Sequence, residues 1–220
     1  MTSTGCDIVA LKAIDAARTK QQNFYSKIIT PAEKGLYDSC FTDSIPLEVF
    51  AWLAWSVKES AYKFLQRLTP GFTFSPSKII LKQVTPPSLS PPILPPELQQ
   101  IGFDNQSVYQ GIANSGDQAL HFRSLITHDF IFSVVNIFDD FEDTYWGIKY
   151  IDTKEPAGQS ESVREFILEK LDSLFPGGNL VVQKSAHGYP VILQNDIKVP
   201  VAVSFTHHDH WVAYSFVTTE

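Results

Sequence analysis

The most regular pattern of apolar residues in the chain lies between Pro46 and Leu68. Apolar side chains recur there at steps of three and four residues, which places them on one face of a helix. They are Phe50, Leu53, Ala54, Val57, Ala61, Phe64, Leu65 and Leu68. Trp52, Glu59 and Lys63 fall on the opposite side, and Trp55 lies between the two faces. The pattern predicts a long amphipathic helix with one buried face and a second face that carries reactive side chains.

Two further segments have the features of helices. Thr30 followed by Pro31 and Glu33 matches a capped helix start, in which threonine caps the first turn and glutamate reaches back to the cap. Residues 162–175 form a second amphipathic pattern, which Pro176 and the two following glycines end. The polar stretch at residues 12–27 is also expected to be helical.

Short apolar segments predict the strands. They lie at residues 7–11, 78–84, 180–184 and 190–193, in a hairpin at 121–135, and in a longer stretch at 199–217 that turns near His208 and Asp209. Residues 85–96 contain six prolines and predict an extended connector, because proline cannot continue a helix or a central strand. The acidic residues Asp139, Asp140, Glu142 and Asp143 indicate a solvated loop.

Part of the sequence is repeated. The segment from Ser124 to Ser133 aligns with the segment from Ser204 to Ala213, and a helix and a strand precede both. This favours an α+β fold of two similar halves, each an antiparallel sheet packed against a long helix, related by a pseudo-two-fold axis. The halves are expected at residues 1–150 and 151–220, in a chain that is a monomer. The alternative is a coincidental likeness between short strands.

Composition narrows the class of protein. The 220 residues are 44% hydrophobic and carry a formal net charge of −7, which argues against general binding to nucleic acid or to anionic membranes. The two cysteines do not form a CxxC pair. No apolar segment reaches the roughly 18 residues needed to span a bilayer, and no secretory signal is evident. A cytoplasmic protein is therefore expected.

Three segments together resemble the 4′-phosphopantetheinyl transferase superfamily. They are Gly5-Cys6-Asp7-Ile8-Val9, the stretch from Trp55 to Lys63 (WSVKESAYK), and Gly188-Tyr189-Pro190 followed by Ser204-Phe205-Thr206-His207. Each is similar to a short family motif, and they occur in the family's order across most of the chain. The motif order is that of the small holo-acyl-carrier-protein synthase type, whereas the length and the repeat are those of the two-unit type.

The resemblance implies an enzyme that moves phosphopantetheine from coenzyme A to a serine of an acyl or peptidyl carrier protein, as in fatty acid biosynthesis, and releases 3′,5′-ADP. It implies that Asp7 and Glu59 hold Mg²⁺, with Mn²⁺ as an alternative. Glu59, directly or through water, would take the serine proton, and Lys63 would neutralise the phosphate and protonate the leaving group. Two carboxylates plus substrate phosphates suit this ion. Val9 stands where the two-unit type carries another acid.

The resemblance also implies the nucleotide contacts. Thr206 and His207 would bind the 3′-phosphate, Gly188 and Pro190 would shape the adenine pocket, and Lys58 would contact a phosphate. Lys12, Arg18 and Lys27 are candidates for binding an acidic helix of the carrier protein; the alternative is an ordinary solvated basic surface.

Two other functions stay open at this point. One is a non-catalytic relative that binds coenzyme A or the carrier protein without reaction. The other is an unrelated zinc hydrolase that uses His207, His208, Asp209 and His210. Neighbouring residues of a strand point to opposite faces, so these four side chains could share a metal only through a tight turn.

Overall fold

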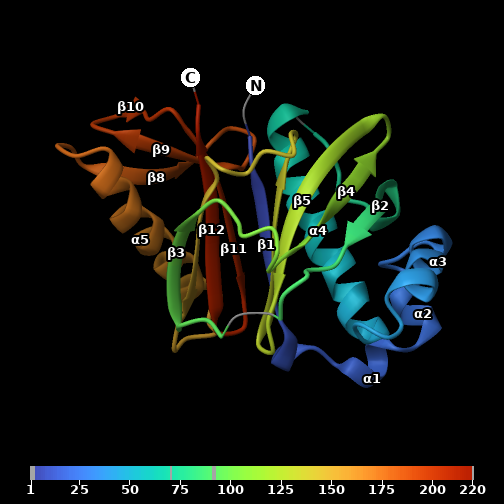
Figure 1. Cartoon of the computed structure of the whole chain (residues 1–220). Helices are drawn as coiled ribbons and strands as arrows, with labels where there is room; N and C mark the ends of the chain where they lie inside the picture. Colours follow the sequence, from blue (N-terminus) through green and yellow to red (C-terminus); the bar gives the residue numbers. More distant parts are fainter. Residues whose placement is uncertain (1–2, 70, 91–92, 220) are drawn as a thin grey trace.

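The computed structural model describes residues 3–69, 71–90 and 93–219. Its first sheet has the strand order β1-β6-β5-β4-β2, and every neighbouring pair is antiparallel. The strands are β1 (Gly5–Ala10), β2 (Ile79–Thr85), β4 (Tyr109–Ser115), β5 (Gln118–Ile126) and β6 (Phe130–Asn136). Helix α4 (Leu47–Leu68) lies along one face of this sheet (Figure 1). A large apolar core fills the space between them.

The second sheet has the order β11-β12-β7-β3, again antiparallel. Its strands are β3 (Glu97–Ile101), β7 (Tyr145–Tyr150), β11 (Val201–His208) and β12 (Trp211–Thr218). Helix α5 (Pro156–Leu174) packs on it, and a small sheet of β8 (Leu180–Lys184), β9 (Pro190–Gln194) and β10 (Ile197–Lys198) lies beside it. Figure 1 shows the two sheets side by side, with α4 packed behind the first sheet and α5 beside the second. The predicted mixed α+β class with antiparallel sheets is confirmed.

Strand β1 joins the two sheets. Its outer edge faces β11, where side chains rather than backbone groups satisfy the edge amides: Cys6 N donates to Ser204 Oγ, Ile8 N to Thr206 Oγ1, and Ala10 N to His208 Nδ1. These hydrogen bonds are 2.9–3.2 Å long. A third apolar cluster lies between the sheets and includes residues of β1, β6, β7 and β12. Within the described residues, the two sheets are therefore tied by packing and by side chains, and no backbone ladder joins β1 to β11.

The predicted long helix is present, because its apolar face is buried as its periodicity requires. Phe50, Leu53, Val57 and Phe64 are all fully buried. Gly5 lets β1 approach this helix closely, since a Cβ there would lie 2.0 Å from the carbonyl oxygen of Ser60. The helix therefore lies directly against the strand that carries Asp7.

The predicted helix cap at Thr30 is also confirmed. Thr30 Oγ1 accepts a hydrogen bond from Glu33 N, and Thr30 N donates to Glu33 Oε2 at 2.7 Å. This box begins α3 (Pro31–Cys40). The preceding polar stretch forms a 3₁₀ turn at Leu11–Ala13 and two short helices, α1 (Ala16–Thr19) and α2 (Gln22–Tyr25).

Several boundaries differ from the sequence-based expectation. Helix α5 begins at Pro156, six residues before the expected start, because proline is well accommodated in a first turn. Strands β3, β4, β7 and β10 lie outside the predicted strand segments. The proline-rich connector contains no helix in its described residues; Pro91 and Pro92 lie outside them.

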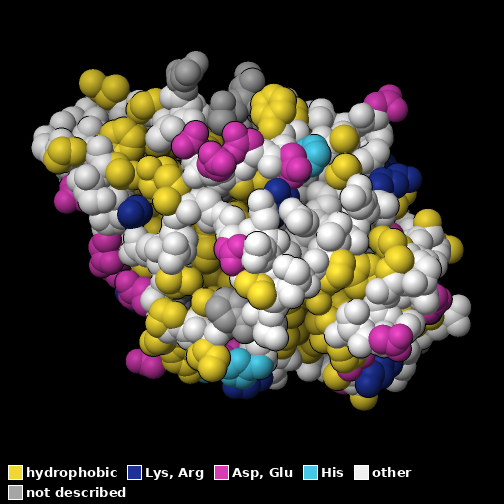
Figure 2. Space-filling model, in the orientation of Figure 1, with side chains coloured by type: hydrophobic (Ala, Val, Ile, Leu, Met, Phe, Trp, Pro, Cys, Tyr) yellow, Lys and Arg dark blue, Asp and Glu magenta, His cyan; other side chains and the backbone are white. Residues whose placement is uncertain are grey.

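The acidic loop is exposed, as predicted. Asp139, Asp140, Glu142 and Asp143 are exposed, whereas Phe141 between them is buried. Figure 2 shows acidic side chains gathered near the end of the molecule where the two termini lie. The described residues include no helix that is both long enough and apolar enough to cross a membrane.

The residue-by-residue alignment of the repeat is wrong. Ser124 shares the α4-facing side of its strand with Phe122, whereas Ser204 faces β1 and accepts a hydrogen bond from Cys6 N. The aligned serines thus lie on opposite faces, and a shift of one residue exchanges the faces of a strand. The two hairpins correspond when their two-residue turns, His128-Asp129 and Asp209-His210, are aligned instead.

Candidate active site

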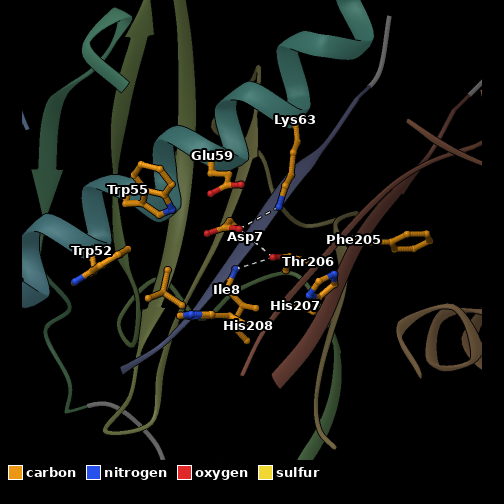
Figure 3. Close-up of a pocket in the computed structure, with 11 residues that line it drawn as sticks. Asp7, Ile8, Trp52, Trp55, Glu59, Lys63, Phe205, Thr206, His207 and His208 are labelled. Atoms are coloured by element: carbon orange, nitrogen blue, oxygen red, sulfur yellow. Dashed lines mark hydrogen bonds and ion pairs between the residues drawn. The ribbon is translucent and has the colours of Figure 1, made fainter. Parts of the chain in front are cut away.

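A cavity of about 500 Å³ opens between α4, β1 and β11. Its walls come from segments that are far apart in sequence: the start of the chain, the long helix and the last hairpin. The lining residues are Asp7, Ile8, Val9, Trp52, Trp55, Glu59, Lys63, Phe205, Thr206, His207 and His208 (Figure 3). The structure therefore brings five of the predicted site residues to one place.

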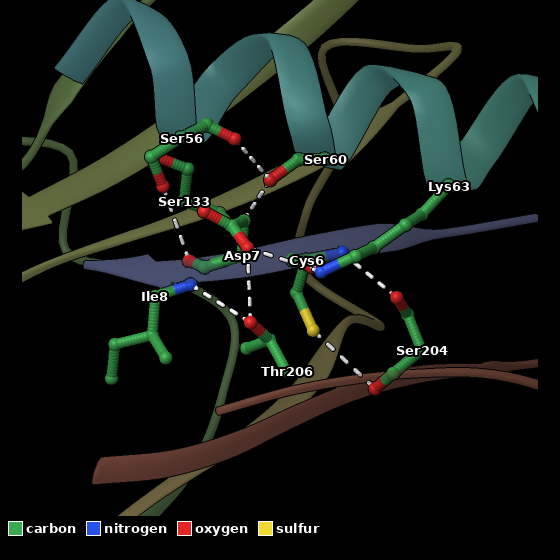
Figure 4. Close-up of polar contacts among 9 residues, drawn as sticks. All are labelled: Cys6, Asp7, Ile8, Ser56, Ser60, Lys63, Ser133, Ser204 and Thr206. Atoms are coloured by element: carbon green, nitrogen blue, oxygen red, sulfur yellow. Dashed lines mark hydrogen bonds and ion pairs between the residues drawn. The ribbon is translucent and has the colours of Figure 1, made fainter. Parts of the chain in front are cut away.

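Asp7 lies at the centre of the polar contacts. It is 5% exposed, and its Oδ1 accepts hydrogen bonds from Lys63 Nζ at 3.1 Å and from Thr206 Oγ1 at 3.0 Å (Figure 4). No described residue hydrogen-bonds to its Oδ2. One carboxylate oxygen is therefore held by the protein, and the other remains available to a ligand.

Lys63 spans from the helix to β1. Its Nζ donates to the backbone oxygen of Cys6 at 2.9 Å as well as to Asp7. Burial alone would lower the pKa of Lys63, but the carboxylates of Asp7 and Glu59 outweigh it and raise that pKa. The amine thus stays protonated at neutral pH and is a fixed positive charge in the cavity.

Glu59 lies next to Asp7 on the helix side of the cavity (Figure 3). Burial and, after it, the negative charge of Asp7 raise the pKa of Glu59, against the opposing effects of Lys63 and the Trp55 indole. A carboxylate whose charge is disfavoured by a neighbouring carboxylate is a suitable ligand for a cation. The described residues contain no group of three or more His, Cys, Asp and Glu that could hold a metal.

Thr206 and His207 approach the cluster from the second sheet. The Thr206 hydroxyl donates to Asp7 Oδ1 and accepts from Ile8 N, so its single hydrogen is already used within the protein. It orients Asp7, rather than being free to donate to a phosphate. Desolvation and the Lys63 ammonium lower the pKa of His207, which is therefore neutral at pH 7.

The four residues 207–210 do not converge on one metal site. His208 Nδ1 accepts from Ala10 N, and His210 Nδ1 lies 2.9 Å from the backbone oxygen of Ile151. Asp209 pairs with Lys154. These three side chains contact different parts of the molecule, and none of these contacts joins them to His207.

The structure does not bring Lys58 to the cavity, contrary to the expected phosphate contact. Its side chain is fully buried, and Nζ donates to Glu33 Oε2 at 2.8 Å and to the backbone oxygen of Ile28 at 2.7 Å. Glu33, also fully buried, accepts from Leu81 N as well. Lys58 projects from the helix face opposite to Lys63, so it does not reach the cavity. Through Glu33 it instead connects α4 to α3 and β2.

Comparison with known families matches residues 3–119 to the 4′-phosphopantetheinyl transferase superfamily. The match covers more than half of the chain and includes Asp7, Glu59 and Lys63. The chain belongs to this superfamily. Searches of curated proteins and of solved structures found no match.

Gly188 and Pro190, which the family resemblance assigns to the adenine pocket, do not line the main cavity. Gly188 has a positive φ of 87° in the turn before β9, and Pro190 begins that strand. Arg67, one helical turn beyond Lys63, donates to the backbone oxygen of Pro190 at 3.3 Å and lies 4.8 Å from the centre of the Tyr189 ring. Arg67 and Tyr189 line a second cavity, of about 830 Å³.

The candidate carrier-binding residues of this transferase-superfamily member lie on the surface. Lys12, Arg18 and Lys27 are exposed, and none of them lines the main cavity. Lys12 pairs with Asp129 at 2.6 Å, and the Arg18 guanidinium lies over the Phe24 ring. Arg18 and Lys27 form no ion pair within the described residues, in contrast to Lys12.

Trp52 lines the cavity wall with Glu59 and Lys63, on the helix face where the periodicity placed it. Two features of the cavity were missed from the sequence: His208 lines it, and Thr206 hydrogen-bonds to Asp7. The sequence carries a signal for both, because side chains alternate along β11 and Ser204, Thr206 and His208 must therefore share one face of the strand.

Proposed function

We propose that the chain transfers 4′-phosphopantetheine from coenzyme A to a serine of an acyl or peptidyl carrier protein. The observation that carries this proposal is the cluster of Asp7, Glu59 and Lys63 in one cavity, within the region that matches the superfamily. The proposal includes Mg²⁺, or Mn²⁺ in its place, and a cytoplasmic protein that acts as a monomer.

Asp7 and Glu59 fit a divalent cation. Asp7 Oδ2 and the Glu59 carboxylate would be its protein ligands, and two carboxylates with substrate phosphates are a usual set for Mg²⁺. Burial and, after it, the negative charge of Asp7 raise the pKa of Glu59, and a cation between the two carboxylates would relieve this repulsion. When bound, the ion would neutralise charge on the pyrophosphate.

The protein's own groups have distinct roles in the proposed transfer. Lys63 keeps its proton on Nζ and stabilises negative charge on the pyrophosphate and on the departing 3′,5′-ADP. Its raised pKa favours this electrostatic role over proton donation. Thr206 fixes one oxygen of Asp7. Neutral His207 can donate one N–H to a phosphate oxygen.

The proton of the acceptor serine needs a base. Serine Oγ forms a bond to the phosphorus that carries pantetheine, the bond to the bridging oxygen breaks, and 3′,5′-ADP leaves with that electron pair. Glu59 would take the serine proton, directly or through a water molecule.

We also propose that the chain consists of two pseudo-equivalent halves. With α1–α3, β3, β10 and the 3₁₀ turns set aside, the order β1, α4, β2, β4, β5, β6 recurs as β7, α5, β8, β9, β11, β12. Because β7 pairs with β12, the boundary would lie before β7 rather than at residue 150. When the hairpin turns of the two halves are aligned, Gly147 of the second half corresponds to Asp7 of the first. The second half therefore has no carboxylate at this position, which supports a single catalytic site.

The test incubates the purified chain with coenzyme A, Mg²⁺ and apo forms of fatty-acid, polyketide and peptide-synthetase carriers. Intact-protein mass spectrometry should show the mass of one phosphopantetheine added to a carrier. Glu59→Gln should abolish this gain, whereas Glu48→Gln, on the same helix but outside the cavity, should keep it. Binding of coenzyme A without modification of any carrier would favour the non-catalytic relative.

The carrier surface is tested separately. We propose that Arg18 and Lys27, with a smaller contribution from the paired Lys12, contact an acidic helix of the carrier protein. Arg18→Glu should raise KM for the carrier and leave KM for coenzyme A unchanged. Arg164→Glu, an exposed reversal on α5, is the matched control. Equal effects of both variants would count against this surface.

A further inference from the structure

The main cavity has two chemically different ends. Along α4, Trp52, Trp55, Glu59 and Lys63 follow one another at steps of three and four residues, so they form one row. The charged groups occupy the end near Lys63. The other end is lined by the two tryptophans with Ile8, Val9 and His208, and it contains no Lys, Arg, Asp or Glu among its lining residues.

The tryptophans form a fixed wall. Trp52 Nε1 donates to Thr19 Oγ1 at 3.1 Å, and its ring packs near Phe24. Trp55 packs edge-on against Phe74, with ring centres 5.4 Å apart. The two indoles meet each other at 6.1 Å in an edge-to-face arrangement. Both remain partly exposed, so this wall offers apolar surface that the protein itself does not cover.

His208 adds one directed donor to this end. Its Nδ1 accepts the hydrogen bond from Ala10 N, so the neutral ring carries its hydrogen on Nε2. No described residue hydrogen-bonds to Nε2. Figure 3 places the His208 ring on the same side of Asp7 as Trp52, and the His207 ring on the other side.

We propose that this end of the cavity is a subsite for the pantetheine arm, and that His208 determines its affinity by donating from Nε2 to an amide carbonyl of the arm. This inference rests on the proposed transferase function. The arm combines a gem-dimethyl group with two amides, which matches an apolar wall with a single N–H donor. The anionic nucleotide would extend the opposite way, towards Lys63 and Arg67.

Two substitutions of His208 distinguish the role of its Nδ1 acceptor from that of its Nε2 donor. His208→Asn keeps an acceptor near the position of Nδ1, and thus the bond from Ala10 N, but lacks the Nε2 donor. His208→Gln places an amide donor near Nε2 and loses the Nδ1 acceptor. The ligands are coenzyme A and 3′,5′-ADP, which lacks the arm, and calorimetric titration in Mg²⁺ gives both dissociation constants.

His208→Asn should weaken coenzyme A binding about three- to tenfold, the value of one neutral hydrogen bond. It should leave 3′,5′-ADP binding unchanged, and His208→Gln should bind coenzyme A within about twofold of the wild type. Equal weakening of both ligands, unchanged coenzyme A binding in His208→Asn, or an effect confined to KM for the carrier would overturn the subsite. A wild-type chain that binds neither ligand would instead refute the transferase proposal, and this inference with it.

Discussion

The buried pair of Lys58 and Glu33 allows a quantitative test of how the chain positions its reactive helix. Lys58→Met removes the cation and leaves the Glu33 carboxylate in a site with no exposed surface. Removing one partner of such a pair costs about 3–5 kcal/mol, because the other charge is left uncompensated. Glu33 retains three donors, Thr30 N, Thr30 Oγ1 and Leu81 N, which favours the lower end of that range.

The assay is urea unfolding followed by circular dichroism. With a slope of about 2–3 kcal/mol per molar urea, the midpoint should fall by about 1–2 M. The matched control is Lys82→Met, an exposed lysine of β2, which should change stability by less than about 0.5 kcal/mol. Glu33→Gln combined with Lys58→Met should recover part of the loss, since neither charge remains.

The same variant distinguishes structural from substrate-binding roles. The folded fraction of Lys58→Met, assayed well below its unfolding midpoint, should keep the wild-type KM for coenzyme A. A variant of wild-type stability with a strongly raised KM would refute this reasoning and would support the phosphate contact that the motif implies.

Three other changes test the site and its support. In EDTA, Glu59→Gln should be more stable than wild type near neutral pH. Burial and, after it, the charge of Asp7 raise the folded pKa of Glu59, so the wild-type carboxyl contributes stability only while it is protonated, and this contribution is lost as the pH rises. The urea midpoints of the two proteins should converge below the unfolded pKa of glutamate, and a difference that stays constant with pH would contradict this. Thr206→Val should lower the free energy of unfolding by about 2–4 kcal/mol, since the Ile8 amide loses its acceptor and Asp7 loses one donor. Thr206→Ser, which keeps the hydroxyl, should lower it by about 1 kcal/mol. Equal unfolding curves would show that the Thr206 hydroxyl does not connect β1 and β11. Gly5→Ala should lower the melting temperature sharply, with a loss of about 3 kcal/mol or more, because its Cβ would overlap the Ser60 carbonyl; an unchanged melting temperature would show that α4 can shift.

The elements that sequence predicted well are those whose signals are local. The face of α4 and the cap at Thr30 depend on residues three or four positions apart, so periodicity and capping rules reveal them. Strand β3 (ELQQI) is polar, and β4 contains Gly111, so neither has a strong strand pattern. These strands are stabilised by their neighbours in the sheet, which sequence spacing does not identify.

The candidate site shows the same contrast between residues that local signals reveal and contacts that depend on the fold. Asp7, Glu59, Lys63, Thr206 and His207 meet as the motifs imply. The partner of Lys58 is 25 residues away in the chain, so helix periodicity alone could not reveal that its amine is buried. The role of Thr206 likewise depends on the contact between β1 and β11, across 199 residues.

The junction of β1 with β11 has a consequence for how the cavity is assembled. Asp7 and Thr206 lie on opposite walls but belong to one polypeptide, so closing the site is an intramolecular step with a fixed effective concentration. Dilution cannot separate these walls, and a second copy of the chain is not needed to supply either of them. Because side chains rather than a backbone ladder make the junction, each point of attachment can also be altered by a single substitution without rebuilding either sheet.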